Sequence, residues 1–142
     1  MNVMGLSTIG AAALSWSLVF ISGSEAWLSH YTPAPIEGYA ISPGQVSAGE
    51  RAMVDWRIVK RTDCKGQNAR VWVGENGFHL AEAYRPTGLP TSNDWRTYHI
   101  ETEIPDLAPP GKLSLSIEGF YQCPGSQRQD FTLGPVQMEV NG

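Results

Sequence analysis

The sequence has few of the residues and motifs that mark a catalytic or cofactor-binding site. It contains two cysteines, and two thiolates are too few to complete a tetrahedral zinc site. It contains no Gly-x-Ser-x-Gly elbow, no Gly-x-Gly-x-x-Gly or phosphate-binding loop, and no Cys-x-x-Cys pair. The three histidines, His30, His79 and His99, lie far apart in the chain. We therefore predict a protein that is not an enzyme, with no catalytic residues, no metal site and no cofactor.

Basic residues are also scarce, and they are unevenly distributed. The formal net charge is −4 and the isoelectric point is near 5.3, so nucleic acid, which needs a basic surface, is not an expected partner. More than half of the 10 basic residues lie between residues 51 and 70. Either they pair with acidic residues on neighbouring strands, or some of them surround one loop end and bind an anionic partner such as lipid headgroups or an acidic glycan. The residues predicted at that loop end are Lys60, Arg61, Lys65 and Arg70.

The N-terminal segment has no charged side chain up to Ser24, and residues 3–22 form one apolar stretch. As a helix, a stretch of about 20 residues spans roughly 30 Å, the thickness of the hydrocarbon core of a bilayer. We predict a hydrophobic helix over residues 1–26 that anchors the chain in a lipid bilayer through residues 3–22. Trp27 and Tyr31 would then lie at the membrane interface. Two other interpretations stay open: a signal peptide cleaved after Ala26, and an apolar helix that is soluble or buried in a virion.

Two further predictions concern this helix and the segment after it. Small residues one turn apart, such as Ala11 and Ser15, would let two helices approach closely and form a homo-oligomer. Residues 27–37 contain alternate prolines, which favour extended backbone, and are predicted to be a linker. The folded β-domain would then occupy residues 38–142.

The rest of the chain alternates between apolar and polar residues with a period of two, which is typical of half-buried β-strands. Strands are predicted over residues 38–42, 51–61, 95–104, 111–123 and 131–140, with a hairpin over residues 71–83. The clearest inner faces are Ala52, Val54, Trp56 and Ile58 in one strand, and Leu113, Leu115, Ile117, Gly119, Tyr121 and Cys123 in another. Six or seven short antiparallel strands joined by turns predict an all-β sandwich.

Two positions within these strands have specific signals. Asn76-Gly77 is the preferred pair for a two-residue type I′ turn, because both positions need a positive φ. Such a turn would place Val73 opposite Leu80. The alternation of the last strand breaks at Gly134-Pro135, and a proline inside a strand belongs at a sheet edge or at a bulge.

Cys64 and Cys123 are separated by a long stretch of chain, which suits a disulfide between distant strands of a sandwich. Closing such a loop stabilises a fold by about 4 kcal/mol on the chain-entropy model. A disulfide implies an oxidising compartment, so we expect the β-domain to be extracytoplasmic, either periplasmic or extracellular. Two thiols that do not pair are the alternative.

Several residues resemble the pattern of immunoglobulin-like domains. The two cysteines, Trp56, Trp72 and the segment Tyr121-Gln122-Cys123 are similar to that pattern. Pro109-Pro110-Gly111 before an alternating strand is similar to a turn of immunoglobulin-like and fibronectin type III-like domains. The resemblance covers residues 38–140 and implies an immunoglobulin-like antiparallel β-sandwich. The layout of an N-terminal apolar helix followed by a β-domain with two cysteines also resembles that of short, poorly characterised proteins encoded by tailed bacteriophages.

Together these features predict a non-enzymatic, membrane-anchored binding or structural module outside the cytoplasm. Its partner would be a protein or a glycan bound by loops, with Tyr84, Arg85, Leu89 and Trp95 as candidate contacts. One alternative is a phage virion or assembly component, secreted or virion-associated, whose N-terminal helix is buried in protein or membrane. Another is a lysis or envelope-disrupting accessory protein.

Overall fold

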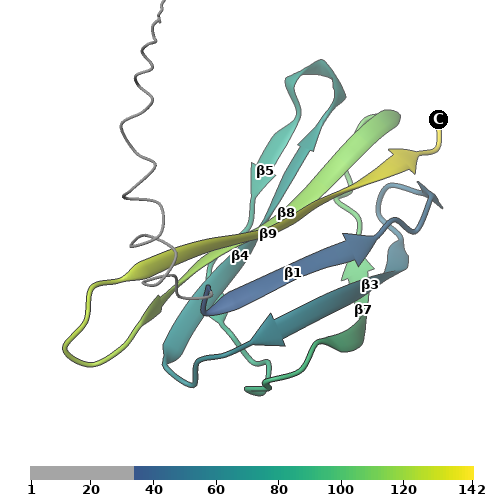
Figure 1. Ribbon diagram of the computed structural model, residues 1–142. Coiled ribbons are helices and arrows are strands. Elements are labelled where there is room, and N and C mark those ends of the chain that lie inside the picture. The colour runs from purple at the N-terminus through teal and green to yellow at the C-terminus, as the bar shows by residue number, and fades with distance from the viewer. Residues whose placement is uncertain (1–33) are drawn as a thin grey trace, which may run out of the picture. The chain divides into compact units, whose positions relative to one another are not determined.

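The computed structural model describes residues 34–142, which form two β-sheets (Figure 1). The first sheet has the strand order β1-β3-β7, and the second has the order β2-β9-β8-β4-β5, with β6 also paired with β4. All pairs are antiparallel except β2 and β9, which are parallel. The strands are β1 (Ile36–Ile41), β2 (Gln45–Val46), β3 (Arg51–Lys60), β4 (Lys65–Gly74), β5 (His79–Ala81), β6 (Arg85–Pro86), β7 (Arg96–Glu103), β8 (Gly111–Gln122) and β9 (Gln129–Val140).

The predicted all-β class is confirmed for residues 34–142. The strands are more numerous than the predicted six or seven, because the two-residue strands β2 and β6 add short ladders to β9 and β4. The predicted N-terminal helix, with its bilayer-contacting residues 3–22 and with Trp27 and Tyr31, lies outside the described residues. From residue 34 onward, no helix has the length and apolar character needed to cross a membrane.

One hydrophobic core lies between the two sheets. β3 contributes the face that its alternation predicted, and Val54, Trp56 and Ile58 are each at most 2% exposed. The second sheet contributes Trp72 from β4 and alternate residues of β8 and β9 to the same core. The contributing residues of β8 and β9 are Leu113, Leu115, Tyr121, Phe131, Leu133, Val136, Met138 and Val140.

The break in β9 at Gly134-Pro135 is confirmed as a bulge. Phe131 and Leu133 are buried before it and Val136 after it, so the buried positions change parity. The register between β8 and β9 shifts at the same point, between Leu115 and Ile117. Gly134 has a φ of +90°, a left-handed conformation that glycine adopts readily. The bulge lets both halves of β9 face the core.

The hairpin between β4 and β5 has the predicted type I′ turn, with φ of +56° at Asn76 and +76° at Gly77. The predicted pairing of Val73 with Leu80 is wrong by one residue, because Val73 lies opposite His79. The cause is a bulge next to the turn. The N–H of Gly74 donates to the carbonyl of Phe78, and the N–H of Phe78 donates to the carbonyl of Glu75. Gly74 and Glu75 therefore both lie opposite Phe78, which is the two-to-one pairing of a β-bulge.

The first strand begins earlier than predicted, at Ile36 and inside the predicted linker. Ile36 pairs with Lys60 at the end of β3, and the N–H of Arg61 donates to the carbonyl of Pro35 at 2.7 Å. These bonds extend the β1–β3 ladder by two residues beyond the predicted start. The described chain therefore enters the domain next to the end of β3, and Figure 1 shows the C-terminus at the opposite end.

Two glycines on inner faces make room for two aromatic rings. Tyr121 and Phe131 stack with ring centroids 5.2 Å apart. A Cβ at Gly66 would lie 2.4 Å from the Tyr121 ring, and a Cβ at Gly119 would lie 2.5 Å from the Phe131 ring. The two rings can occupy these places only because β4 and β8 lack side chains there.

We predict that Gly119→Ala destabilises the domain by about 1–3 kcal/mol, the usual cost of overpacking a core. The added methyl would also lie 2.3 Å from the carbonyl oxygen of Gln67, which the backbone ladder holds in place. Urea unfolding measures the change. Gly88→Ala is the matched control, because nothing lies within 4 Å of a Cβ at Gly88. Equal stability of the two variants would contradict the prediction.

Candidate functional site

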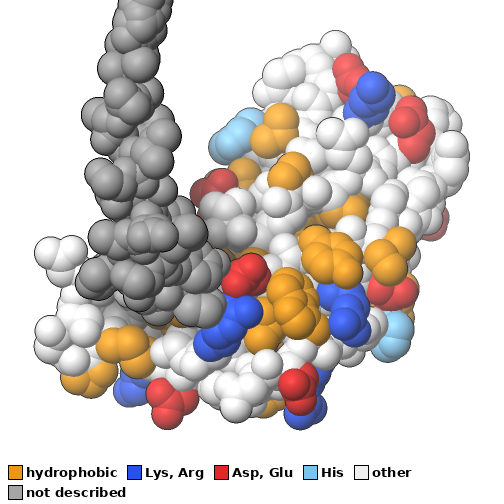
Figure 2. All heavy atoms as spheres, in the orientation of Figure 1, with side chains coloured by type: hydrophobic (Ala, Val, Ile, Leu, Met, Phe, Trp, Pro, Cys, Tyr) orange, Lys and Arg blue, Asp and Glu red, His pale blue; other side chains and the backbone are white. Residues whose placement is uncertain are grey.

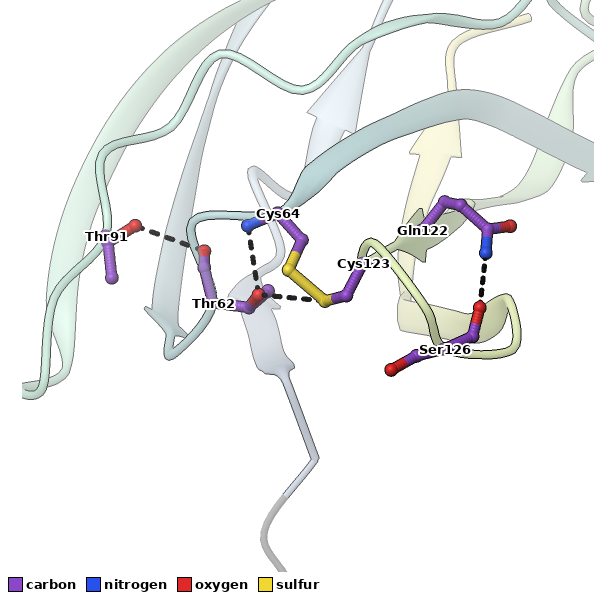
Figure 3. Close-up of a disulfide and its surroundings, with 6 residues drawn as sticks. All are labelled: Thr62, Cys64, Thr91, Gln122, Cys123 and Ser126. Carbon is purple, nitrogen blue, oxygen red and sulfur yellow. Dashed lines mark hydrogen bonds between the residues drawn. A yellow bond between two sulfur atoms is a disulfide. The ribbon is translucent and has the colours of Figure 1, made fainter.

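Cys64 and Cys123 form a disulfide that closes one end of the second sheet (Figure 3). The pair is as predicted, but its position between distant strands is not. Lys65 pairs with Gln122 at the end of the β4–β8 ladder. Cys64 directly precedes Lys65, and Cys123 directly follows Gln122. The disulfide therefore joins neighbouring strands of one sheet. The sequence did not reveal this because it does not specify that β4 and β8 are neighbours.

Hydrogen bonds hold the loops around the disulfide in place. The Thr62 hydroxyl accepts from the N–H of Cys64 at 3.0 Å and lies 3.8 Å from Sγ of Cys123. The Thr91 hydroxyl donates to the carbonyl of Thr62, and the Gln122 amide donates to the carbonyl of Ser126 (Figure 3). We call this region, with loops 61–64, 87–95 and 123–128, the disulfide end. These loops extend from the end of the β4–β8 ladder that the disulfide closes.

Lys60 and Leu89, two of the predicted contact residues, meet at this end. The Lys60 side chain is buried, with the residue 8% exposed, and its Nζ donates to the carbonyl oxygen of Leu89 at 2.8 Å. Nζ also lies 5.8 Å from the centre of the Tyr121 ring. The Leu89 side chain packs against the core. Lys60 is thus a buried cation beneath loop 87–95.

Arg61 and Arg70 are both engaged by carboxylates. The guanidinium of Arg61 pairs with Glu37 and donates to the carbonyl of Ala34. Arg70 lies within β4 and not at the predicted loop end, because β4 runs without a break from Lys65 to Gly74. Its Nε donates to Oε1 of Glu82 at 3.0 Å, and its Nη2 lies 3.0 Å from the same oxygen. The other Glu82 oxygen accepts from Trp72 Nε1 at 2.8 Å.

The remaining predicted contacts fall on two separate surfaces. Tyr84 packs edge-on against Phe120 with centroids 5.6 Å apart, on the outer face of the second sheet. Arg85 lies in β6, with Nη2 at 3.5 Å from Glu82. Trp95 instead packs beside Tyr39, which belongs to the first sheet. Tyr84 and Trp95 therefore do not contribute to one surface.

The outer face of the first sheet presents exposed apolar side chains. Tyr39, Ile41 and Met53 are each more than half exposed, and Trp95 lies beside Tyr39. Figure 2 shows hydrophobic side chains gathered over β1 and β3, with charged side chains among them. On this face His99 Nδ1 lies 2.6 Å from a carboxylate oxygen of Asp55 on the neighbouring strand.

A groove at the disulfide end brings several of the candidates together with residues that sequence reasoning did not select. It encloses about 530 Å³. The lining includes Lys60, Asp63, Lys65, Gln67, Thr87 and Phe120, and we call it the Lys60–Phe120 groove. Phe120 had a sequence signal, because it is the one apolar residue on the otherwise polar face of β8. Gln67 and Thr87 had none, because the β4–β6 pairing that brings them together joins segments far apart in the chain.

The Tyr121 hydroxyl is buried behind this groove. Its oxygen has no hydrogen-bond partner of ordinary geometry among the described residues. Burial raises the pKa of Tyr121 above its ordinary value of 10.0, and the nearby Thr87 hydroxyl opposes that increase only in part. The phenol is therefore held in its neutral form.

No known protein-family model and no curated protein matches this chain. Within residues 34–142, no three His, Cys, Asp or Glu side chains gather as they would around a metal ion. The candidate site is accordingly defined by the groove and its side chains alone.

We predict that Tyr121→Phe does not lower stability at pH 8, because it removes a buried hydroxyl that lacks a partner. Above pH 10 the variant should become the more stable of the two. The unfolded chain releases the tyrosine proton near pH 10, whereas the folded protein holds it to higher pH, so ionisation favours the unfolded wild type. Urea unfolding at pH 8, 10 and 11 measures both effects. If the free energies of unfolding of the two proteins changed equally between pH 8 and pH 11, the raised pKa of Tyr121 would be contradicted.

Replacing both cysteines by serine should lower the free energy of unfolding by up to about 4 kcal/mol, from the loop of 59 residues that the disulfide closes. Denaturant titration with and without reductant measures the loss. Reductant should destabilise the wild type and leave the double variant unchanged. A reductant effect of the same size on both proteins would show that the disulfide does not stabilise the fold.

Proposed function

We propose that the protein is a membrane-anchored, non-enzymatic binding module whose β-domain lies outside the cytoplasm. The observation that carries this proposal is the Cys64–Cys123 disulfide, because structural disulfides persist in oxidising compartments. The apolar stretch of residues 3–22 supplies the expected anchor. The homo-oligomer expected from small residues in that stretch remains part of the same proposal.

The domain itself we propose to be an immunoglobulin-like sandwich. The order β1-β3-β7 corresponds to strands A, B and E of that fold, and β9-β8-β4-β5 corresponds to G, F, C and C′. Trp72, with no exposed surface, lies on the strand that corresponds to C, where antibody domains have a buried tryptophan. The disulfide departs from that pattern, because it joins C to F within one sheet and antibody domains join B to F between the sheets.

Binding is proposed at the disulfide end. Loops on a rigid scaffold commonly carry recognition, and here the scaffold is held by the disulfide and by hydrogen bonds from Thr62, Thr91 and Gln122. The Lys60–Phe120 groove opens among these loops. Elsewhere on the described surface several charged side chains form ion pairs, as Arg51 does with Glu101 and Arg128 with Asp130.

The compartment is tested on the full chain, produced in its native host or in a bacterium. We expect it to stay in the membrane fraction after carbonate extraction. A maleimide added during lysis should label neither cysteine until a reductant is added. Intact mass with and without reductant reports the disulfide, and it also shows whether cleavage after Ala26 has occurred.

Free reaction of both thiols with maleimide would overturn the extracytoplasmic placement. Co-purification with phage particles in place of membranes would favour the virion component. Depolarisation of the membrane by a chain that lacks residues 38–142 would favour the lysis accessory. A Cys64→Ser/Cys123→Ser chain is the matched control for labelling.

A further inference from the structure

Lys60 is a buried cation that no carboxylate neutralises among residues 34–142. It is 8% exposed, and none of the ion pairs in this part of the chain includes it. An ammonium has three N–H donors, and the only hydrogen bond that Nζ makes here is to the carbonyl of Leu89. A buried charge is costly unless it is paired and hydrogen-bonded. The Lys60 ammonium thus has donors and charge to offer to a ligand in the groove that it lines.

The same groove holds a second cation and one carboxylate. Lys65 is exposed at the start of β4 and, within the described domain, forms no ion pair. Asp63 is the only acidic side chain in the lining, and it lies more than 4 Å from the charged nitrogens of both lysines. The groove therefore has a net positive charge with one separate acceptor for hydroxyl groups.

Phe120 gives the groove an apolar wall. Its ring forms a T-shaped pair with Tyr84 and contacts the Arg128 guanidinium, whose central carbon lies 4.1 Å from the ring centroid. Beside it, the Gln67 amide can both donate and accept hydrogen bonds, and the Thr87 hydroxyl, which accepts from Nδ2 of Asn68 at 2.9 Å, can still donate one. Thr87 is held in place, because its N–H donates to the carbonyl of Gly66.

We propose that the Lys60–Phe120 groove binds an acidic sugar residue of a glycan through the carboxylate of that sugar. The carboxylate would pair with Lys60 and Lys65, the sugar hydroxyls would bond to Asp63, Gln67 and Thr87, and the C–H face of the ring would pack on the exposed part of Phe120. A simple anion would use the two cations and leave the aromatic wall and the hydroxyl acceptor unused. The inference rests on the proposed binding function and names its ligand class.

The test is isothermal titration calorimetry on the full chain in an uncharged detergent. The probes are trigalacturonic acid and sialyllactose, each compared with its neutral counterpart, galactotriose and the methyl ester of sialyllactose. At least one acidic probe should bind, and its neutral counterpart should bind at least tenfold more weakly, since a hydrogen-bonded charge is worth that much or more. The binding of the acidic probe should also weaken as salt concentration rises.

Three variants locate the contact. Lys65→Gln should weaken binding of the acidic probe about tenfold, and Phe120→Leu should weaken both the acidic and the neutral sugar. The matched control is Lys112→Gln, because Lys112 is also an exposed lysine without an ion pair but lies at the far end of β8. Circular dichroism confirms that each variant is folded.

Several outcomes would overturn the inference. These are an absence of binding by both acidic probes to the folded chain, equal binding of acidic and neutral sugars, and an equal loss with Lys65→Gln and Lys112→Gln. Inorganic phosphate or a short polyglutamate peptide that binds as tightly as the acidic sugars would replace the glycan with a simple anion or a protein. In all these cases the thiol-labelling and fractionation results would stand, so failure of the ligand class is distinct from failure of the proposed function.

Discussion

The stacking of Tyr121 on Phe131 is possible only because two neighbouring positions have no side chain. Gly66 and Gly119 leave the space that the two rings occupy on the inner faces of β4, β8 and β9. The Lys60 ammonium lies over the Tyr121 ring, 5.8 Å from its centroid. The disulfide joins β4 to β8 one residue beyond Gln122. The stacked rings, the buried cation and the disulfide therefore lie together at one end of the domain.

Burial distinguishes Lys60 from the other charged residues of the described chain. Arg51, Arg61 and Arg70 all have carboxylate partners, so ordinary pairing accounts for half of the basic residues between positions 51 and 70. Such pairs contribute little to stability when they are exposed. Lys60 is different, because burying an ammonium without a carboxylate has a free-energy cost that a neutral residue would avoid. In the proposed complex, the carboxylate of the sugar would pair with this ammonium.

The alternation of apolar residues predicted most of the strands and their inner faces, because the period of two is a local property of extended backbone. Val54, Trp56 and Leu115 could be placed in the core on that basis alone. Turn chemistry at Asn76-Gly77 and the break at Gly134-Pro135 were readable for the same reason. The hairpin register was not, because the bulge at Gly74 depends on bonds across the turn.

The sequence alone therefore determined the β class, most strand positions and the two residues of the disulfide. Only the tertiary structure decided which strands are neighbours, and with it the place of the disulfide within one sheet, the separation of Tyr84 from Trp95, and the meeting of Lys60, Thr87 and Phe120 in one groove. These features join segments that are far apart in the chain, and a local pattern of apolar and polar residues has no information about which distant segment will pair with it.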